Sequence, residues 1–499
     1  MLKKHYDIII IGAGVTGCML ARQLSYYNVN ICVIEKSIYV CSGQSKANGA
    51  IVHAGHNEEP GSLKARLCLK GNKMFPDLCK QFGVFFKQSG YVVLAFNEEE
   101  IIGIKKLEKQ SLVNGVNVEI IDAVRLAEIE PNVSKKAKIA LWVKDAGYVD
   151  VHRFIIAAAE HAAINGVDFI FNTEVKDLIW YDNNYKEVVG VSTDKGDYYA
   201  KLIINCAGIN ADHIIRKAGN NDFKFTARKG EYYIIDKSEG KILNGPVYHV
   251  PTIYGKGCMV TPSAHGNTIF GGNSVEVFDC NDISTSNSGF DYVLKKSCKL
   301  IPCIRNKKII AGYSGIRSTL DGKDYFIGPM DGVKGLINIV GIDSPGLTSS
   351  PAIASYVKDL ILEEFLNLKI NKSRKTNYNI KPLFRDLSNN EKEIWLKKDP
   401  RYGRLVCRCE NVTEGDIISA IHSPIPAITT DALKFKTWVG AGRCQGSFDL
   451  PRLISIIAEE LKIDSINILK GLPGSNIVLG YSRDFKTGKN DKVYKRKNF

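Results

Sequence analysis

The sequence lacks any long hydrophobic run. Of its 499 residues 44% are hydrophobic, yet the longest apolar stretches have the length of strands, well short of the roughly 20 residues that a membrane-spanning helix needs. The apolar start of the chain superficially resembles a signal peptide, but a glycine motif inside it marks it as the first strand of a fold. No transmembrane segment is therefore expected, and a cytoplasmic protein of about two or three domains is predicted.

The sequence also lacks internal repeats and the cysteine framework of a secreted protein. Because no secretory signal is expected, its thirteen cysteines are expected to be reduced thiols. Ten are scattered, and Cys18, Cys32 and Cys206 lie in apolar segments where a cysteine serves as a small core residue. Only Cys407, Cys409 and Cys444 form a pattern that suggests a metal site or cluster.

Positive charge is plentiful, but part of it is concentrated at one end. The net charge is +14, and residues 486–499 hold six Lys or Arg residues against one Asp. Aromatic residues are nearly absent there, so the tail is interpreted as a solvated end, and no nucleic-acid partner is expected. The remaining positive excess suits a small anionic substrate.

A glycine motif near the N-terminus predicts a dinucleotide site. Gly12, Gly14 and Gly17 follow an apolar run and open a helical segment, and Glu35 ends the next apolar run. The first glycine permits a tight turn, the second lets a pyrophosphate approach the backbone, and the third lets helix and strand pack closely. The acid accepts hydrogen bonds from a ribose hydroxyl, while the helix N-terminus attracts the phosphates. A redox enzyme is the natural interpretation.

Residues 1 to about 370 alternate strand-like and helix-like stretches. A helix is expected over Arg153–Asn165, and a buried strand ending in a glycine turn over Leu202–Gly208. Four short β-rich segments predict an antiparallel sheet in a substrate domain; they lie near 224–235, 246–252, 257–262 and 268–272. The composition turns polar over residues 371–398, which indicates a linker to a small C-terminal module.

The loop Ser42–Gly55 closely resembles the flavin-contacting loop of the D-amino-acid-oxidase-like superfamily. Within that superfamily it is most similar to the branch of type II glycerol-3-phosphate oxidases and L-2-hydroxyglutarate oxidases. The resemblance continues in the same order through five further motifs, at 229–232, 256–262, 265–267, 315–317 and 341–348. It implies FAD rather than NAD, and a second strand-flanked Gly-x-Gly-x-x-Gly for a nicotinamide nucleotide is indeed missing.

The resemblance implies an α/β fold in which a Rossmann-like FAD-binding domain is interleaved with an antiparallel-sheet substrate domain. The FAD-binding parts are expected at about 1–82, 150–215 and 312–370, and the substrate parts at about 83–149 and 216–311. The residues implied to contact FAD are Gly12, Gly14, Gly17, Glu35, Ser45, Lys46, Asn48, Val175, Ala207, Gly208, Gly315, Gly346, Leu347 and Thr348.

Three residues match family positions that act on the substrate. His53 matches the proposed base that takes a hydroxyl proton while a hydride passes to flavin N5, a task suited to a histidine. The alternative is that His53 only packs in the loop or bonds to FAD. Lys256 and Arg317 match positions that hold the substrate's anionic end, where arginine offers a fork and lysine a point charge; the alternative for both is an ordinary ion pair.

The C-terminal module resembles the bacterioferritin-associated-ferredoxin-like [2Fe-2S] domain over residues 399–465, followed by a basic extension over 466–499. The resemblance implies a small helical module. Cys407, Cys409 and Cys444 match three of its four ligand positions, but the fourth position is Asp449. Four thiolates are usual for such a cluster. Either the carboxylate completes the ligand shell, or the cluster is lost and the module serves interaction.

Taken together, these features predict FAD-dependent oxidation of a small anionic secondary alcohol. The favoured substrate is sn-glycerol-3-phosphate, oxidised to dihydroxyacetone phosphate, and the close alternative is L-2-hydroxyglutarate. A third hypothesis is a non-catalytic flavoprotein subunit. Oxygen, a quinone and a redox protein all stay open as the electron acceptor.

Overall fold

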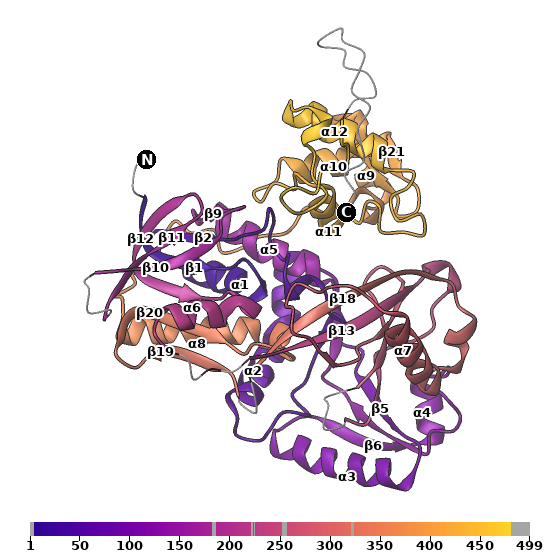
Figure 1. Ribbon diagram of the computed structural model, residues 1–499. Coiled ribbons are helices and arrows are strands. Elements are labelled where there is room, and N and C mark those ends of the chain that lie inside the picture. Colours follow the sequence, from indigo (N-terminus) through magenta and orange to yellow (C-terminus); the bar gives the residue numbers. More distant parts are fainter. Residues whose placement is uncertain are drawn as a thin grey trace.

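The computed structural model describes residues 4–181, 186–220, 223, 225–251, 257–320 and 324–480. Lys256 and the basic tail at 486–499, both singled out in the sequence, lie outside these residues. The described chain forms two α/β bodies side by side, with a small helical module, coloured yellow, docked on top (Figure 1). None of the described helices is both long and apolar enough to cross a membrane.

The first body is built on an eight-stranded sheet of mixed direction. β1 lies in its centre, pairs in parallel with β2 and β12, and carries the glycine motif at its end. β12 also pairs in parallel with β20, whereas β10, β11 and β19 join as antiparallel strands. The strands are β1 (Lys4–Ile11), β2 (Ile31–Ile34), β9 (Asp168–Ile170), β10 (Val175–Trp180), β11 (Val188–Thr193), β12 (Gly196–Asn205), β19 (Phe326–Met330) and β20 (Val333–Val340).

Helices cover both faces of this sheet. Ile8 and Ile10 of β1 point into one core with four long helices, while Ile9 and Ile11 point into a second core with α6 (Ala211–Lys217). A strand buried on both faces is a continuous apolar run, which explains the isoleucines of β1. The four helices are α1 (Val15–Leu24), α2 (Leu63–Phe82), α5 (Val151–Ile164) and α8 (Gly346–Glu364).

The second body contains a nine-stranded sheet that is antiparallel apart from the β14–β5 pair. Its longest ladder joins β13 (Phe225–Ile235) to β18 (Ile309–Leu320). Because β18 belongs to this sheet over its whole length, the expected domain boundary at residue 312 falls inside a strand. The other strands are β5 (Tyr91–Ala95), β6 (Val118–Asp122), β7 (Ile139–Val143), β14 (Val247–His249), β15 (Met259–Pro262), β16 (Thr268–Gly271) and β17 (Val275–Glu276).

Three helices flank this second sheet, and a small sheet lies near the first body. The helices are α3 (Glu98–Val113), α4 (Ala123–Ile129) and α7 (Asn287–Leu300). The small sheet consists of β3 (Ile51–Val52), β8 (Gly147–Val149) and β4 (Phe86–Lys87). The α/β architecture with an interleaved antiparallel domain agrees with the fold class expected from the sequence.

The C-terminal module is mostly helical, as expected. It contains a short hairpin and four helices: β21 (Leu405–Cys407), β22 (Val412–Thr413), α9 (Asn389–Lys398), α10 (Glu414–Ile421), α11 (Thr430–Thr437) and α12 (Leu450–Leu461). α9 lies within the stretch expected to be a linker, and it begins with a capping box at Ser388 and Glu391, which fixes a helix start even in a polar segment.

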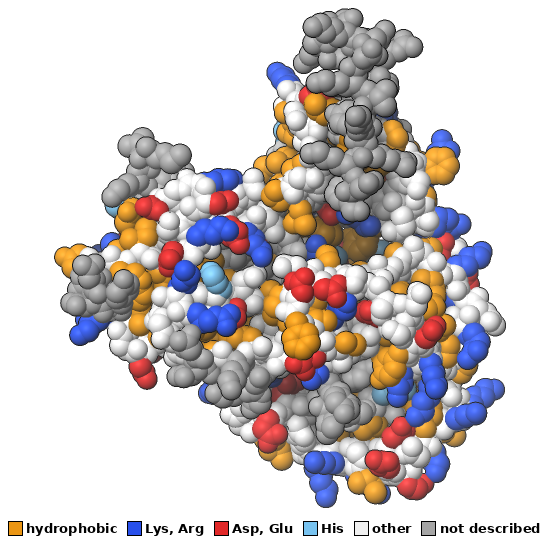
Figure 2. Space-filling view, in the orientation of Figure 1, with side chains coloured by type: hydrophobic (Ala, Val, Ile, Leu, Met, Phe, Trp, Pro, Cys, Tyr) orange, Lys and Arg blue, Asp and Glu red, His pale blue; other side chains and the backbone are white. Residues whose placement is uncertain are grey.

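The module docks on α5 of the first body. Lys436 of α11 forms a buried ion pair with Glu160 of α5, and His152 stacks on Phe435 with ring centroids 4.9 Å apart. The face drawn in Figure 2 shows lysine and arginine interspersed with acidic side chains across the described residues. On this face, the positive excess does not form one continuous patch.

Candidate functional site

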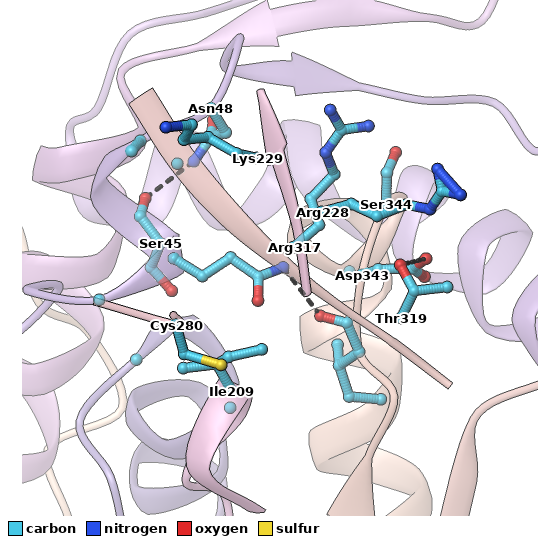
Figure 3. Close-up of a pocket in the computed structure, with 18 of the residues that line it drawn as sticks. Ser45, Asn48, Ile209, Arg228, Lys229, Cys280, Arg317, Thr319, Asp343 and Ser344 are labelled. Carbon is cyan, nitrogen blue, oxygen red and sulfur yellow. Dashed lines mark hydrogen bonds between the residues drawn. The ribbon is translucent and has the colours of Figure 1, made fainter. Parts of the chain in front are cut away.

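A cavity of about 1530 Å³ extends along the ends of the first sheet to the β13–β18 ladder of the second. It is lined by the glycine turn after β1, the end of β2, the 42–55 loop, β18 and the start of α8. Figure 3 shows part of this wall, with Ser45 and Asn48 of the loop and Arg317 and Thr319 of β18. A cavity of this size can hold a dinucleotide and a small substrate together.

The glycine turn has the geometry that its motif predicts. Gly12 has φ +102°, and a Cβ there would lie 2.6 Å from the carbonyl oxygen of Cys206. A Cβ on Gly17 would lie 2.0 Å from the carbonyl oxygen of Gly12, so α1 packs closely on the turn. Gly14 is the N-cap of α1 and provides no side-chain cap. The first residues of the helix lie on the cavity wall, where a helix N-terminus can attract an anion.

Glu35 and Ser45 hold the end of the cavity beside α1 in shape. The Glu35 carboxylate accepts hydrogen bonds from the backbone N–H groups of Ala13 (2.7 Å) and Ser37 (2.8 Å). Ser45 Oγ accepts from the N–H of Val15 at 3.0 Å. These bonds tie β2 and the 42–55 loop to the first turn of α1.

The loop is also fixed against the second sheet. Asn48 Nδ2 donates to the Ser45 carbonyl and its Oδ1 accepts from the Ala50 N–H, both at 2.8 Å. The Tyr313 hydroxyl of β18 donates to the Asn48 carbonyl at 2.8 Å. A Cβ on Gly315 would lie 2.3 Å from the carbonyl oxygen of Ala47, so glycine is required where β18 passes the loop.

Most residues proposed from the sequence meet at this cavity. Lys256 lies outside the described residues. Gly17, Lys46 and Thr348 do not line the cavity: Gly17 packs under the turn, the Lys46 carbonyl contacts His152 Nε2 at 3.2 Å, and Thr348 is fully buried. The residues that line it are Gly12, Gly14, Glu35, Ser45, Asn48, His53, Val175, Ala207, Gly208, Gly315, Arg317, Gly346 and Leu347.

His53 is a buried histidine held by its backbone. Its N–H donates to Thr348 Oγ1 at 2.8 Å, which gives Thr348 a positioning task instead of a place on the cavity wall. The ring lies beside Tyr91 and Tyr248, which pack on each other, and its centroid is 6.1 and 6.3 Å from theirs. His53 Nε2 is 3.4 Å from Ser344 Oγ. Burial raises the pKa of both tyrosines far above their ordinary value, so their hydroxyls stay protonated.

Arg317 lies at the same cavity on β18. Its Nη2 donates to the carbonyl of Asn273, while its Nε is buried and has no hydrogen-bond partner among the described residues. A Cβ on Gly230 would lie 2.7 Å from Nη2, so the guanidinium extends over this glycine. A buried donor without a partner is costly, and a bound anion would satisfy it.

The sequence reasoning missed several residues of the cavity wall. Arg228 and Tyr232 of β13, Tyr248 of β14 and Ser344 all line the cavity. Tyr232 and Ser344 lie within the family motifs at 229–232 and 341–348, but the sequence analysis assigned neither of them a task, and Arg228 and Tyr248 lie outside the motifs. The period-2 alternation along β13 could have shown that Arg228 and Tyr232 lie on one face. It could not have shown which strand lies opposite them.

The four proposed cluster ligands lie together in the module as two pairs. Burial and the neighbouring Asp449 carboxylate raise the pKa of Cys407 to about 12. The Cys444 N–H acts to lower the pKa of Cys409, but burial, the Cys444 thiol and Asp449 together raise it. Asp449 is buried, and its Oδ2 has no hydrogen-bond partner among the described residues.

Within the described part of the chain, no three His, Cys, Asp or Glu side chains surround a single point as one bound ion requires. A [2Fe-2S] cluster differs, because each of its two irons takes two protein ligands. Two pairs of donors, with the N–H groups of Gly440 and Glu410 bonded to the Cys407 sulfur, fit that need. The orphaned Asp449 oxygen fits the fourth ligand position.

The cysteine site faces the second body across ion pairs. Lys237 contacts Glu410 at 3.0 Å and Arg443 contacts Asp236 at 3.1 Å. A cavity of about 250 Å³ at this seam is lined by these four residues and by Cys409. The module is therefore joined both to the end of β13 and to α5.

Comparison with known proteins gives two family matches. Residues 7–360 match the family described as FAD dependent oxidoreductase, and residues 405–459 match the BFD-like [2Fe-2S] binding domain.

Relatives of known name cover most of the chain. This chain is 39% identical over 480 residues to a glycerol 3-phosphate dehydrogenase of Caloramator mitchellensis. The alignment covers 95% of this chain and 98% of that protein. The chain is 28% identical over 409 residues to the mitochondrial L-2-hydroxyglutarate dehydrogenase of Arabidopsis thaliana, covering 72% and 84%. The solved structure of dithionite-reduced L-alpha-glycerophosphate oxidase from Mycoplasma pneumoniae with FAD bound superposes with a TM-score of 0.70 at 26% identity, covering 76% and 100%.

Proposed function

Because the chain belongs to the FAD dependent oxidoreductase family, we propose that it oxidises sn-glycerol-3-phosphate to dihydroxyacetone phosphate. The observation that carries this proposal is the pairing, in one cavity, of buried His53 with Arg317, whose Nε has no partner among the described residues. A base and an anion-binding group are what oxidation of an anionic alcohol needs. The name of the Caloramator relative supports the choice of substrate.

The residues at the cavity fit FAD. Gly12 and Gly14 leave room for a pyrophosphate at the start of α1, and Glu35 lies at the end of β2 where the ribose is expected. Gly346 and Leu347 begin α8, whose N-terminus would face the pyrimidine end of the flavin and favour negative charge there. FAD, when bound, supplies the hydride acceptor of the reaction.

The remaining chemistry is assigned to side chains of the chain. His53 takes the proton of the substrate hydroxyl, in a wall of neutral tyrosines that limits access of water. Arg317 binds the anionic end of the substrate through its fork. Lys256 is also proposed to bind the anionic end of the substrate, and this role rests on the family resemblance alone.

The electron acceptor and the module belong to the same proposal. Cys407, Cys409 and Cys444, with Asp449 as fourth ligand, would hold a [2Fe-2S] cluster. A carboxylate is a harder donor than a thiolate, so this cluster would be more labile than one with four cysteines. Oxygen, a quinone and a redox protein all remain candidate acceptors. A cytoplasmic location is also part of the proposal. Isolated cysteines in apolar segments are typical of proteins in a reducing compartment.

L-2-hydroxyglutarate is a second candidate substrate, supported by the Arabidopsis relative. It also has a secondary hydroxyl and an anionic end. The third hypothesis, a non-catalytic flavoprotein subunit, is disfavoured by the meeting of His53 and Arg317 at one cavity.

Anaerobic reduction of the bound flavin tests these alternatives. The holoprotein is mixed with glycerol-3-phosphate, L-2-hydroxyglutarate or uncharged glycerol, and bleaching of the flavin absorbance is followed. We expect rapid bleaching by glycerol-3-phosphate and slow or no bleaching by glycerol. Faster bleaching by L-2-hydroxyglutarate would make it the preferred substrate in place of glycerol-3-phosphate. No bleaching by any polyol phosphate or hydroxyacid would favour the non-catalytic subunit.

A further inference from the structure

Two arginines lie directly opposite each other in the wall of the cavity. In the antiparallel ladder of β13 and β18, Arg228 is the cross-strand partner of Arg317. Such partners point to the same face of the sheet, and Figure 3 shows both side chains beside the Asp343–Ser344 corner. Like charges directly opposite each other destabilise a sheet, so an arrangement of this kind calls for a compensating anion.

The described residues do not supply that anion through an ion pair. The nearby Asp343 carboxylate is engaged by Lys64 at 2.8 Å and by the Thr319 hydroxyl at 3.2 Å, and it forms no ion pair with either arginine among the described residues. Among the residues that the structure describes, Arg317 bonds only to the Asn273 carbonyl through Nη2, and Arg228 makes a single long contact of 3.5 Å to Ser274 Oγ. Glu276 on β17 lies opposite Arg228 on its other side, but it is exposed and forms no ion pair with Arg228 among the described residues.

The neighbouring lysine behaves differently. Lys229, next to Arg228 in β13, is buried and forms an ion pair with Asp282 at 2.7 Å. Its charge is therefore compensated within the protein. In contrast to Lys229, the guanidinium groups of Arg228 and Arg317 form no ion pair with any residue in the described part of the chain.

We propose that Arg228 and Arg317 form a two-arginine clamp for the phosphate of a phosphate monoester dianion, with Arg228 as a specificity-determining residue. This inference rests on the proposed function and narrows its substrate class. Each guanidinium is a planar fork that binds two oxygens at once. A phosphate monoester presents three terminal oxygens and close to two negative charges at neutral pH, so it can engage both forks.

A carboxylate engages the clamp less completely. It has two oxygens and one negative charge, so a carboxylate on Arg317 leaves the charge of Arg228 in excess. The clamp therefore favours glycerol-3-phosphate over L-2-hydroxyglutarate through Arg228 in particular. Removing Arg228 should reduce this preference as well as the affinity.

The test uses the FAD-loaded full-length protein and three variants. Arg228→Gln removes the charge and the fork, and Arg228→Lys keeps the charge but not the fork. Arg125→Gln is the matched control, because Arg125 lies on α4, is half-exposed and pairs with Glu128, so it changes the net charge equally without touching the cavity.

Rapid mixing without oxygen gives both the apparent Kd for glycerol-3-phosphate and the limiting rate of flavin reduction. Arg228→Gln should raise the Kd about 10- to 100-fold, the effect of losing a charge-assisted fork, with the limiting rate changed by less than about threefold. Arg228→Lys should give a smaller rise. Arg125→Gln should leave both values within about twofold of wild type.

Binding of inorganic phosphate, followed by its perturbation of the flavin spectrum, gives a readout that does not depend on turnover. Weaker phosphate binding in Arg228→Gln supports the clamp even if the wild type is not reduced by glycerol-3-phosphate, in which case the proposed function alone fails. Equal phosphate and substrate Kd values in Arg228→Gln and Arg125→Gln overturn the clamp. If Arg228→Gln does not retain FAD, wild-type Kd values in Arg228→Lys overturn it.

Discussion

The docking of the C-terminal module can be tested at one buried ion pair. Lys436 of α11 contacts Glu160 of α5, and their side chains are 8% and 1% exposed. Removing one partner of a buried pair typically costs about 3–5 kcal/mol, because the other charge stays buried. The Tyr378 hydroxyl also donates to Glu160, at 2.6 Å, and would still hold the carboxylate in Lys436→Met. We therefore expect a cost near the lower end, about 3 kcal/mol.

Hydrogen exchange measured by mass spectrometry reports this cost locally, which matters because a chain of several domains does not unfold in one step. Exchange in α11 should become about 100-fold faster in Lys436→Met, as 3 kcal/mol implies. The double variant Glu160→Gln/Lys436→Met should recover most of the protection, since it leaves no uncompensated charge. The reasoning would be refuted by unchanged exchange of α11 in Lys436→Met. It would also be refuted if α11 exchanged as fast in the double variant as in Lys436→Met.

Four further predictions follow from the sites. His53→Asn should slow flavin reduction by substrate about 10²–10⁴-fold with normal FAD content; loss of FAD with a normal rate in the remaining holoprotein would make His53 a structural contact. Arg317→Met should weaken substrate binding about 10- to 150-fold, and equal reduction by glycerol and glycerol-3-phosphate would exclude this role. Asp449→Cys should raise iron and sulfide content in protein purified without oxygen, whereas a folded but iron-free variant would show that the module has lost its cluster. Burial raises the pKa of Glu130 to about 7, so between about pH 4.5 and 7 the folded state binds one proton more than the unfolded state. The free energy of unfolding should therefore fall as pH rises through this range. Denaturation midpoints measured across it should depend less on pH in Glu130→Gln than in the wild type.

The sequence alone was sufficient for features whose cause is local. The glycine turn follows from Gly12 and Gly17. A side chain on Gly17 would collide with the backbone of the turn itself, and one on Gly12 would collide with the backbone at the end of the adjoining strand. The isoleucines of β1 and the apolar run of β2 indicated buried strands, since burial on both faces leaves no polar positions. Cys407, Cys409 and Cys444 were evident from spacing within one small module.

The tertiary structure decided what depends on pairing between distant segments. Thr348 supports His53 across 295 residues of chain, and no periodicity near either residue indicates that bond. β18 joins the second sheet, and its register with β13 puts Arg317 opposite Arg228. A strand's own pattern shows which residues share a face but not which strand lies beside it, because register is set by the packing of the whole sheet. For the same reason the buried Lys436–Glu160 pair, which fixes the module on the flavin-binding body, could be seen only once both helices were in place.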